Sequence, residues 1–131
     1  MSDLESKLSE YFKNNKSIVL AFLFGSAAKG RQIAESDVDI AVWFKNNYTM
    51  KDIDKIWLEV EKAIKRNIDL IILNQARPTI AWEAMRGKKL SIKNYGLYIK
   101  KMLEVSSEAE DFNNFILDFW KLRRKLRGEI A

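Results

Sequence analysis

The chain has 131 residues, a length typical of one domain, and 47% of them are hydrophobic, which is enough for a buried core. It contains no cysteine and no histidine, which excludes disulfides, cysteine nucleophiles, Cys/His zinc sites and histidine-based catalytic triads. Any metal site must therefore use oxygen ligands, which favours Mg²⁺ or Mn²⁺.

The formal net charge of +5 suits polyanionic partners such as nucleotides or acidic protein surfaces. The sequence has no module that interleaves aromatic and basic residues, so nucleic acid is not an expected partner. No apolar run reaches the roughly 18 residues of a membrane-spanning helix, and the N-terminus lacks the basic-then-apolar order of a signal peptide. We therefore expect a cytoplasmic protein without a membrane partner.

Apolar periodicity and turn residues predict an alternation of helices and strands. In chain order, the predicted elements are a helix over 3–14, a strand over 17–24, a short helix over 26–31, a strand over 37–44, a helix over 50–66, a strand over 67–73, a helix over 78–86, an edge strand over 88–92 and a helical region over about 94–127. The pattern predicts an α/β (α+β) fold, in which a small mixed sheet is flanked by helices. We expect one domain over 1–131, with a core of about 1–92 and a C-terminal helical region of about 93–128.

Two acidic residues follow a glycine turn at a fixed spacing. Gly25 and Ser26 lie between the first predicted strand and a short helix, where backbone N–H groups suit a phosphate. After a ten-residue spacer, Asp37 and Asp39 flank Val38 at the start of the second predicted strand. Alternate strand residues share a face, so the two carboxylates lie side by side and favour a bound cation or a shared proton. The combination is typical of metal-assisted phosphoryl or nucleotidyl transfer.

A third acid, Asp69, lies within an apolar run from Ile68 to Leu73, which predicts that it is buried. A buried acid needs a partner, so we interpret Asp69 as a third metal ligand or as the base that receives the proton of an attacking hydroxyl. An edge-strand acid facing water is the alternative. For Asp37 and Asp39, the alternative is a pair of solvated acids at the boundary between a loop and a strand.

The turn after the first strand also has a structural interpretation. Ser26 can act as a helix N-cap, which is compatible with phosphate binding. Lys29 either neutralises phosphate charge or is solvated, and Arg31 is a second candidate for the same role.

Together these residues resemble the signature of the DNA polymerase β-like nucleotidyltransferases: Gly25-Ser26, the ten-residue spacer, Asp37-Val38-Asp39, and Asp69 as an acid on a later strand. The chain looks most like the minimal nucleotidyltransferases (MNT), which are often the antitoxin half of HEPN/MNT toxin–antitoxin pairs. The small-Arg-Gly usual in that family appears here as Ala28-Lys29-Gly30. Lysine keeps the charge but lacks the bidentate fork of arginine, so its phosphate contact differs.

The resemblance implies the polymerase β-like fold and an enzyme that transfers AMP from ATP, with Mg²⁺ or Mn²⁺, to an acceptor hydroxyl. It implies a HEPN toxin as acceptor, modified on a tyrosine. The residues carried over are Asp37, Asp39 and Asp69 as catalytic and metal-binding acids, and Gly25, Ser26, Lys29 and Arg31 as nucleotide-binding residues. Two alternatives stay open: an antitoxin that binds nucleotide without catalysis and neutralises its toxin by direct contact, and a transferase that modifies a small molecule.

Apolar residues in the C-terminal helical region alternate three and four positions apart: Met102, Val105, Ala109, Phe112, Ile116 and Phe119. Such a stripe packs against the protein's own core, or it forms a surface for a partner or for self-association. The basic run that follows, Lys121, Arg123, Arg124, Lys125 and Arg127, is interpreted as a solvated face that interacts favourably with the helix dipole.

Overall fold

The computed structural model describes residues 3–25 and 37–108. Its elements are α1 (Asp3–Asn14), β1 (Ile18–Phe24), β2 (Val38–Phe44), α3 (Met50–Ile64), β3 (Ile68–Ile72), the 3₁₀ turn η1 (Leu73–Gln75), α4 (Pro78–Met85), β4 (Lys88–Ile92) and α5 (Tyr95–Glu108). Each strand and helix predicted within these ranges is present. The segment after β3, predicted as a loop, begins with the η1 turn instead.

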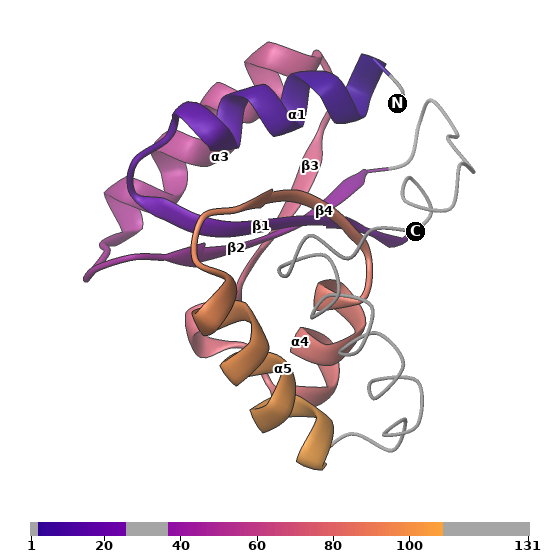
Figure 1. Cartoon of the computed structure of the whole chain (residues 1–131). Helices are drawn as coiled ribbons and strands as arrows, with labels where there is room; N and C mark the ends of the chain where they lie inside the picture. Colours follow the sequence, from indigo (N-terminus) through magenta and orange to yellow (C-terminus); the bar gives the residue numbers. More distant parts are fainter. Residues whose placement is uncertain (1–2, 26–36, 109–131) are drawn as a thin grey trace.

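The four strands form one mixed sheet in the order β3-β2-β1-β4 (Figure 1). β1 is antiparallel to β2 and to β4, whereas β2 and β3 are parallel. The parallel pair is joined by a crossover connection through α3. β4 lies at an edge of the sheet, as predicted. The α/β fold class is therefore confirmed.

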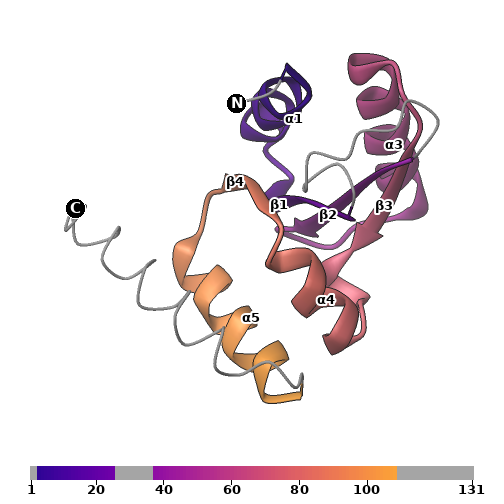
Figure 2. The same cartoon turned by 90° about the vertical axis from the view of Figure 1, so that its right-hand side faces the viewer.

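Helices cover both faces of this sheet. α1 and α3 lie against one face, and α4 and α5 lie against the other, as the two perpendicular views show (Figures 1 and 2). Alternate strand residues divide between two buried clusters that match these layers. On β1, for example, Ala21 and Leu23 join the cluster under α1 and α3, and Leu20 and Phe22 join the cluster under α4 and α5.

The helix between the parallel strands, α3, begins at a capping box and ends at a left-handed residue. The Thr49 side chain accepts a hydrogen bond from the backbone N–H of Asp52, and the Asp52 carboxylate accepts one from the N–H of Thr49. This capping box satisfies two N–H groups at the start of α3. Of the apolar stripe, Ile53, Ile56, Val60 and Ile64 are buried and Trp57 is half-buried, whereas Ala63 is exposed. The helix ends at Lys65, whose φ of 56° is left-handed.

The last described helix, α5, contains the start of the C-terminal apolar stripe. Met102 and Val105 are buried against the cluster under α4 and α5, as the periodicity predicts. The stripe positions from Ala109 onwards and the basic run lie outside the described residues, so the single-domain boundaries and the role of that region stay predictions. Within residues 3–25 and 37–108, no helix has the length and apolar character needed to cross a membrane.

A glycine at the end of α4 permits close packing between that helix and β1. A Cβ atom added at Gly87 would lie 2.3 Å from the backbone oxygen of Leu23 and 2.9 Å from the Cβ of Phe24. Gly87 follows the helix C-cap, and its role is steric, because Gly25 is the only described glycine with a positive φ.

We expect Gly87→Ala to lower the free energy of unfolding by about 1–3 kcal/mol, the usual cost of overpacking, since a backbone oxygen cannot move aside as a side chain does. Gly96→Ala is the matched control. Its added Cβ would be 3.4 Å from Asn94 Oδ1, and alanine in the first turn of α5 should be neutral or stabilising by up to about 1 kcal/mol. Urea unfolding of both variants measures the difference. Equal stability of the two would contradict this account of Gly87.

Candidate functional site

The acidic residues singled out in the sequence meet at one end of the sheet, where β1 ends and β2 and β3 begin. Asp39 is the register partner of Phe24 on β1 and of Asp69 on β3, so it lies between those two strands. Asp37 immediately precedes β2. Gly25 follows the last residue of β1. The fold therefore brings Gly25, Asp39 and Asp69 together from three separate parts of the sequence.

Asp39 and Asp69 face the side of the sheet that carries α4 and α5. Two residues further along each strand, Ala41 and Ile71 pack in the buried cluster under those helices, and residues two apart share a face. Asp39 is half-buried, whereas Asp37 and Asp69 are exposed. The predicted burial of Asp69 is therefore wrong: the apolar residues of β3 bury mainly under α1 and α3, while Asp69 lies at the open start of the strand.

The glycine turn is in direct contact with the central acid. Gly25 has a φ of +72°, which is a left-handed conformation that side chains other than glycine rarely adopt. A Cβ added there would lie 2.2 Å from Oδ2 of Asp39. The carboxylate of Asp39 therefore occupies the space next to the Gly25 Cα, and any other residue at position 25 would displace it. Glycine at this position therefore keeps the backbone and the Asp39 carboxylate in direct contact.

The environment of Asp39 disfavours its charged form. Partial burial raises the pKa of its carboxyl, and the negative charges of Asp69, Asp37 and Glu83 raise it further. Three acids thus act on a single carboxylate: Asp69 on β3, Asp37 just before β2 and Glu83 on α4. A bound cation would relieve this repulsion.

The site fits a divalent metal ion by its chemistry. Its donors are carboxylate oxygens, the ligands that Mg²⁺ prefers, and the repulsion at Asp39 favours a cation. In the part of the chain that the structure describes, no group of three or more acids is drawn together closely enough to form a complete metal site. Asp37, Asp39 and Asp69 therefore stay a predicted ligand set.

A pocket of about 590 Å³ opens beside Gly25, between the end of β1, the start of β4 and α4. It is lined by Phe24, Gly25, Thr79, Trp82, Glu83, Arg86, Gly87 and Lys88. Glu83 and Arg86 belong to no motif of the sequence. Their helix was predicted, but nothing local in the sequence indicates that it lies over the acid-bearing end of the sheet. The other predicted nucleotide-binding residues, Ser26, Lys29 and Arg31, lie outside the described residues.

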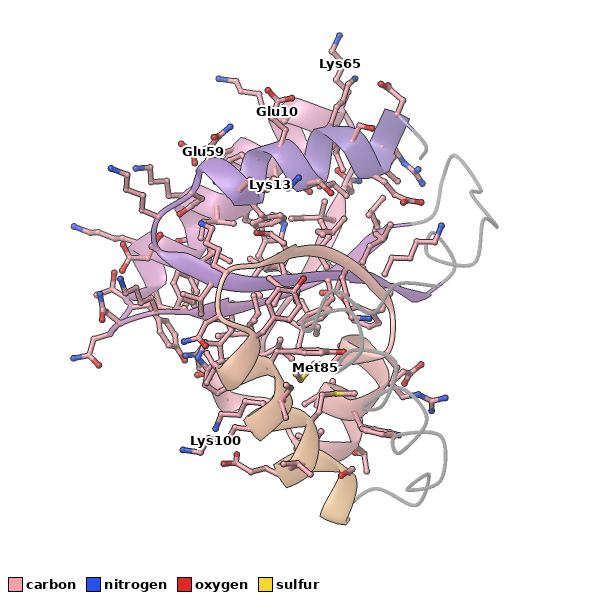
Figure 3. The ribbon with its side chains drawn as sticks, viewed as in Figure 1. Glu10, Lys13, Glu59, Lys65, Met85 and Lys100 are labelled. Atoms are coloured by element: carbon pink, nitrogen blue, oxygen red, sulfur yellow. The ribbon has the colours of Figure 1, made fainter. Side chains whose placement is uncertain are left out.

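A second hollow, of about 660 Å³, lies between α1 and α3 on the opposite face of the sheet. Tyr11 donates a hydrogen bond of 2.6 Å to Glu59 across it, which ties the two helices together. Figure 3 shows the neighbouring Glu10 extending away from the sheet on this face, while Met85 lies inside, between the sheet and α5. Because the sheet separates this hollow from Asp39 and Asp69, we do not assign the active site to it.

Known proteins share this fold. The aligned part of a Methanocaldococcus jannaschii protein called "Putative protein adenylyltransferase" is 30% identical over 60 residues, which are 46% of this chain and 64% of that protein. A chain from a crystal structure of a toxin–antitoxin with AMP-PNP is 20% identical, with a TM-score of 0.68 and 95% of each chain covered. A chain from the tri-AMPylated Shewanella oneidensis HEPN toxin in complex with MNT antitoxin is 16% identical, with a TM-score of 0.61 and 96% of each chain covered.

At these identities the two structures show a common fold, and the match to the archaeal protein spans less than two thirds of its length. The family assignment rests on a wider match. The family model described as polymerase beta, nucleotidyltransferase, matches residues 6–96, which include every acid discussed above. The chain belongs to the polymerase β nucleotidyltransferase family.

Proposed function

We propose that this protein transfers AMP from ATP, with Mg²⁺ or Mn²⁺, to a hydroxyl group on a partner HEPN toxin. The observation that carries the proposal is the pairing of Asp39 with Asp69 on adjacent parallel strands, beside a left-handed Gly25 that touches Asp39. Within a nucleotidyltransferase family, this arrangement supports a site for the reacting phosphate at the end of β1.

Each residue has a distinct part in this reaction. Asp37 and Asp39, with Asp69, would hold the metal, which when bound neutralises phosphate charge and orients the nucleotide. Gly25 keeps the backbone close to Asp39, so that its N–H can meet a phosphate. Asp69 is exposed and can accept the proton of an incoming hydroxyl. The acceptor oxygen then bonds to the α-phosphorus, the bond to the bridging oxygen breaks, and pyrophosphate leaves.

The relatives support an adenine nucleotide and a protein acceptor. One similar structure contains AMP-PNP, an ATP analogue, and another contains a HEPN toxin that carries AMP groups beside its MNT antitoxin. The archaeal relative is named as a protein adenylyltransferase. These properties belong to those proteins, and we extend them to this chain because it shares their fold.

The test uses ATP labelled at either the α- or the γ-phosphate, with Mg²⁺ and a cognate HEPN toxin as acceptor. We expect label from the α-position to appear on the toxin and label from the γ-position to leave as pyrophosphate. Transfer of the γ-label would identify a kinase instead. If the toxin is neutralised with no label transferred, this protein is an antitoxin that acts by direct contact. Transfer to a small molecule alone would identify the third alternative.

A further inference from the structure

The end of the sheet that carries the acids continues beyond Gly25 toward the start of β4. Along this edge the order is Asp69 on β3, Asp39 on β2, Gly25 after β1 and Lys88 on β4, because Lys88 is the register partner of Leu23. Neighbouring strands lie about 4.8 Å apart, so β2 and β4 are separated by about 10 Å across Gly25. The pocket beside Gly25 is lined from β1, α4 and β4, and Asp39 and Asp69 are not among its lining residues.

One guanidinium lines this pocket in a fixed position. The Cζ atom of Arg86 lies 5.2 Å from the centre of the Trp82 ring, and Trp82 is itself only 6% exposed. The next residue, Gly87, lies close to the backbone of Leu23, so the end of α4 packs directly against the end of β1. Arg86 therefore projects from a rigid support, while remaining exposed to the pocket.

The neighbouring lysine points elsewhere. Lys88 shares its strand face with Leu90, which packs under α1 and α3, and its Nζ is 2.6 Å from Glu5 of α1. Glu83, one turn before Arg86, also lines the pocket and is negative, so it adds to the acidic end of the site. The pocket thus has an acid, Glu83, whose charge also acts on Asp39, and a guanidinium, Arg86.

A nucleoside triphosphate has the matching chemistry. Its reacting α-phosphate belongs with the acids, and its β- and γ-phosphates carry the negative charge that a guanidinium binds through two parallel N–H bonds. We propose that Arg86 binds the terminal phosphates of the nucleotide and gives the site its preference for triphosphates over monophosphates. This inference rests on the proposed function. A purely structural role is the competing explanation, because a cation at a helix C-terminus stabilises the helix dipole.

The experiment measures the affinity of the full chain for AMP-PNP, AMP and inorganic tripolyphosphate in the presence of Mg²⁺, by calorimetry. We expect Arg86→Gln to weaken AMP-PNP and tripolyphosphate binding by about 10-fold or more, the scale of a lost hydrogen bond to a charged group. AMP binding should change less than about twofold, because AMP has no terminal phosphates. Arg86→Lys keeps the positive charge but cannot donate two parallel N–H bonds. Its affinity for AMP-PNP and tripolyphosphate should lie between those of the wild type and Arg86→Gln.

Lys100→Gln is the matched control, since it removes an exposed cation of α5 that does not line this pocket. It should leave all three affinities unchanged. If Arg86→Gln fails to fold, Arg86→Lys decides the question. Equal loss of AMP and AMP-PNP binding, or no loss in a folded Arg86 variant, would overturn the inference while leaving the proposed function intact. A wild type that binds no triphosphate would overturn both.

Discussion

Asp39→Asn should yield a protein that is inactive and yet at least as stable as the wild type when no divalent metal is present. Asparagine preserves the shape that fits against Gly25, and it removes the charge that Asp69, Asp37 and Glu83 repel. For partly exposed charges the gain should lie between zero and about 1 kcal/mol in the free energy of unfolding. Nucleotidyl transfer should fall by about 10²–10³-fold or more, the loss typical for one preorganised electrostatic group.

The dependence on pH follows from the direction of the pKa shift. The native state holds the Asp39 proton more tightly than the unfolded state, so this group contributes stability below its unfolded pKa and loses it as the pH rises through the native pKa. Asp39→Asn should therefore have a higher free energy of unfolding than the wild type at pH 7. This difference should vanish below about pH 4, the ordinary pKa of aspartate.

Thermal unfolding in a chelator, then in Mn²⁺, checks this prediction. Mn²⁺ should stabilise the wild type and should have little effect on Asp39→Asn, because metal binding to the native state raises stability by mass action. Asp54→Asn is the control: Asp54 is an exposed acid of α3, on the opposite face of the sheet, and its replacement should change neither stability nor transfer. A clear loss of stability in metal-free Asp39→Asn would contradict this account. It would show that the Asp39 carboxylate of the wild type makes favourable interactions rather than being repelled by the neighbouring acids.

Local features of the sequence were sufficient to predict the elements that carry the site. The apolar run of β1 and the acid–apolar alternation of β2 each depend on neighbours a few residues apart, and both strands are present. Asp39 could be identified for the same reason. Its spacing from Gly25 and the strand face to which it belongs both follow from residues close to it in the sequence.

What the sequence could not predict depends on how distant elements pack. Asp69 is exposed because β3 is covered mainly on one face at its start, which requires the sheet order and the position of α4. Glu83 and Arg86 appear as an ordinary acid and an ordinary base on an amphipathic helix. They join the site only because Gly87 lets α4 approach the backbone of β1.

Asp69→Asn should separate chemistry from nucleotide binding. The residue is exposed at the start of β3, in register with Asp39, so it can meet an acceptor hydroxyl that approaches the α-phosphate from solvent. Asparagine keeps the size of the side chain but cannot accept the proton as a carboxylate does. With no histidine in the chain to take over, transfer to the toxin should fall by about 10²–10⁴-fold.

Binding distinguishes this variant from Asp39→Asn. In Asp69→Asn, Gly25, Asp37 and Asp39 remain, so AMP-PNP affinity in Mg²⁺ should stay within about tenfold of wild type, whereas Asp39→Asn should lose most of its metal-dependent affinity. Parallel measurement of label transfer and AMP-PNP binding for both variants makes the comparison. Full transfer by Asp69→Asn would remove Asp69 from the mechanism. Loss of binding as severe as in Asp39→Asn would instead make Asp69 chiefly a metal ligand, because a base alone contributes nothing to holding the nucleotide.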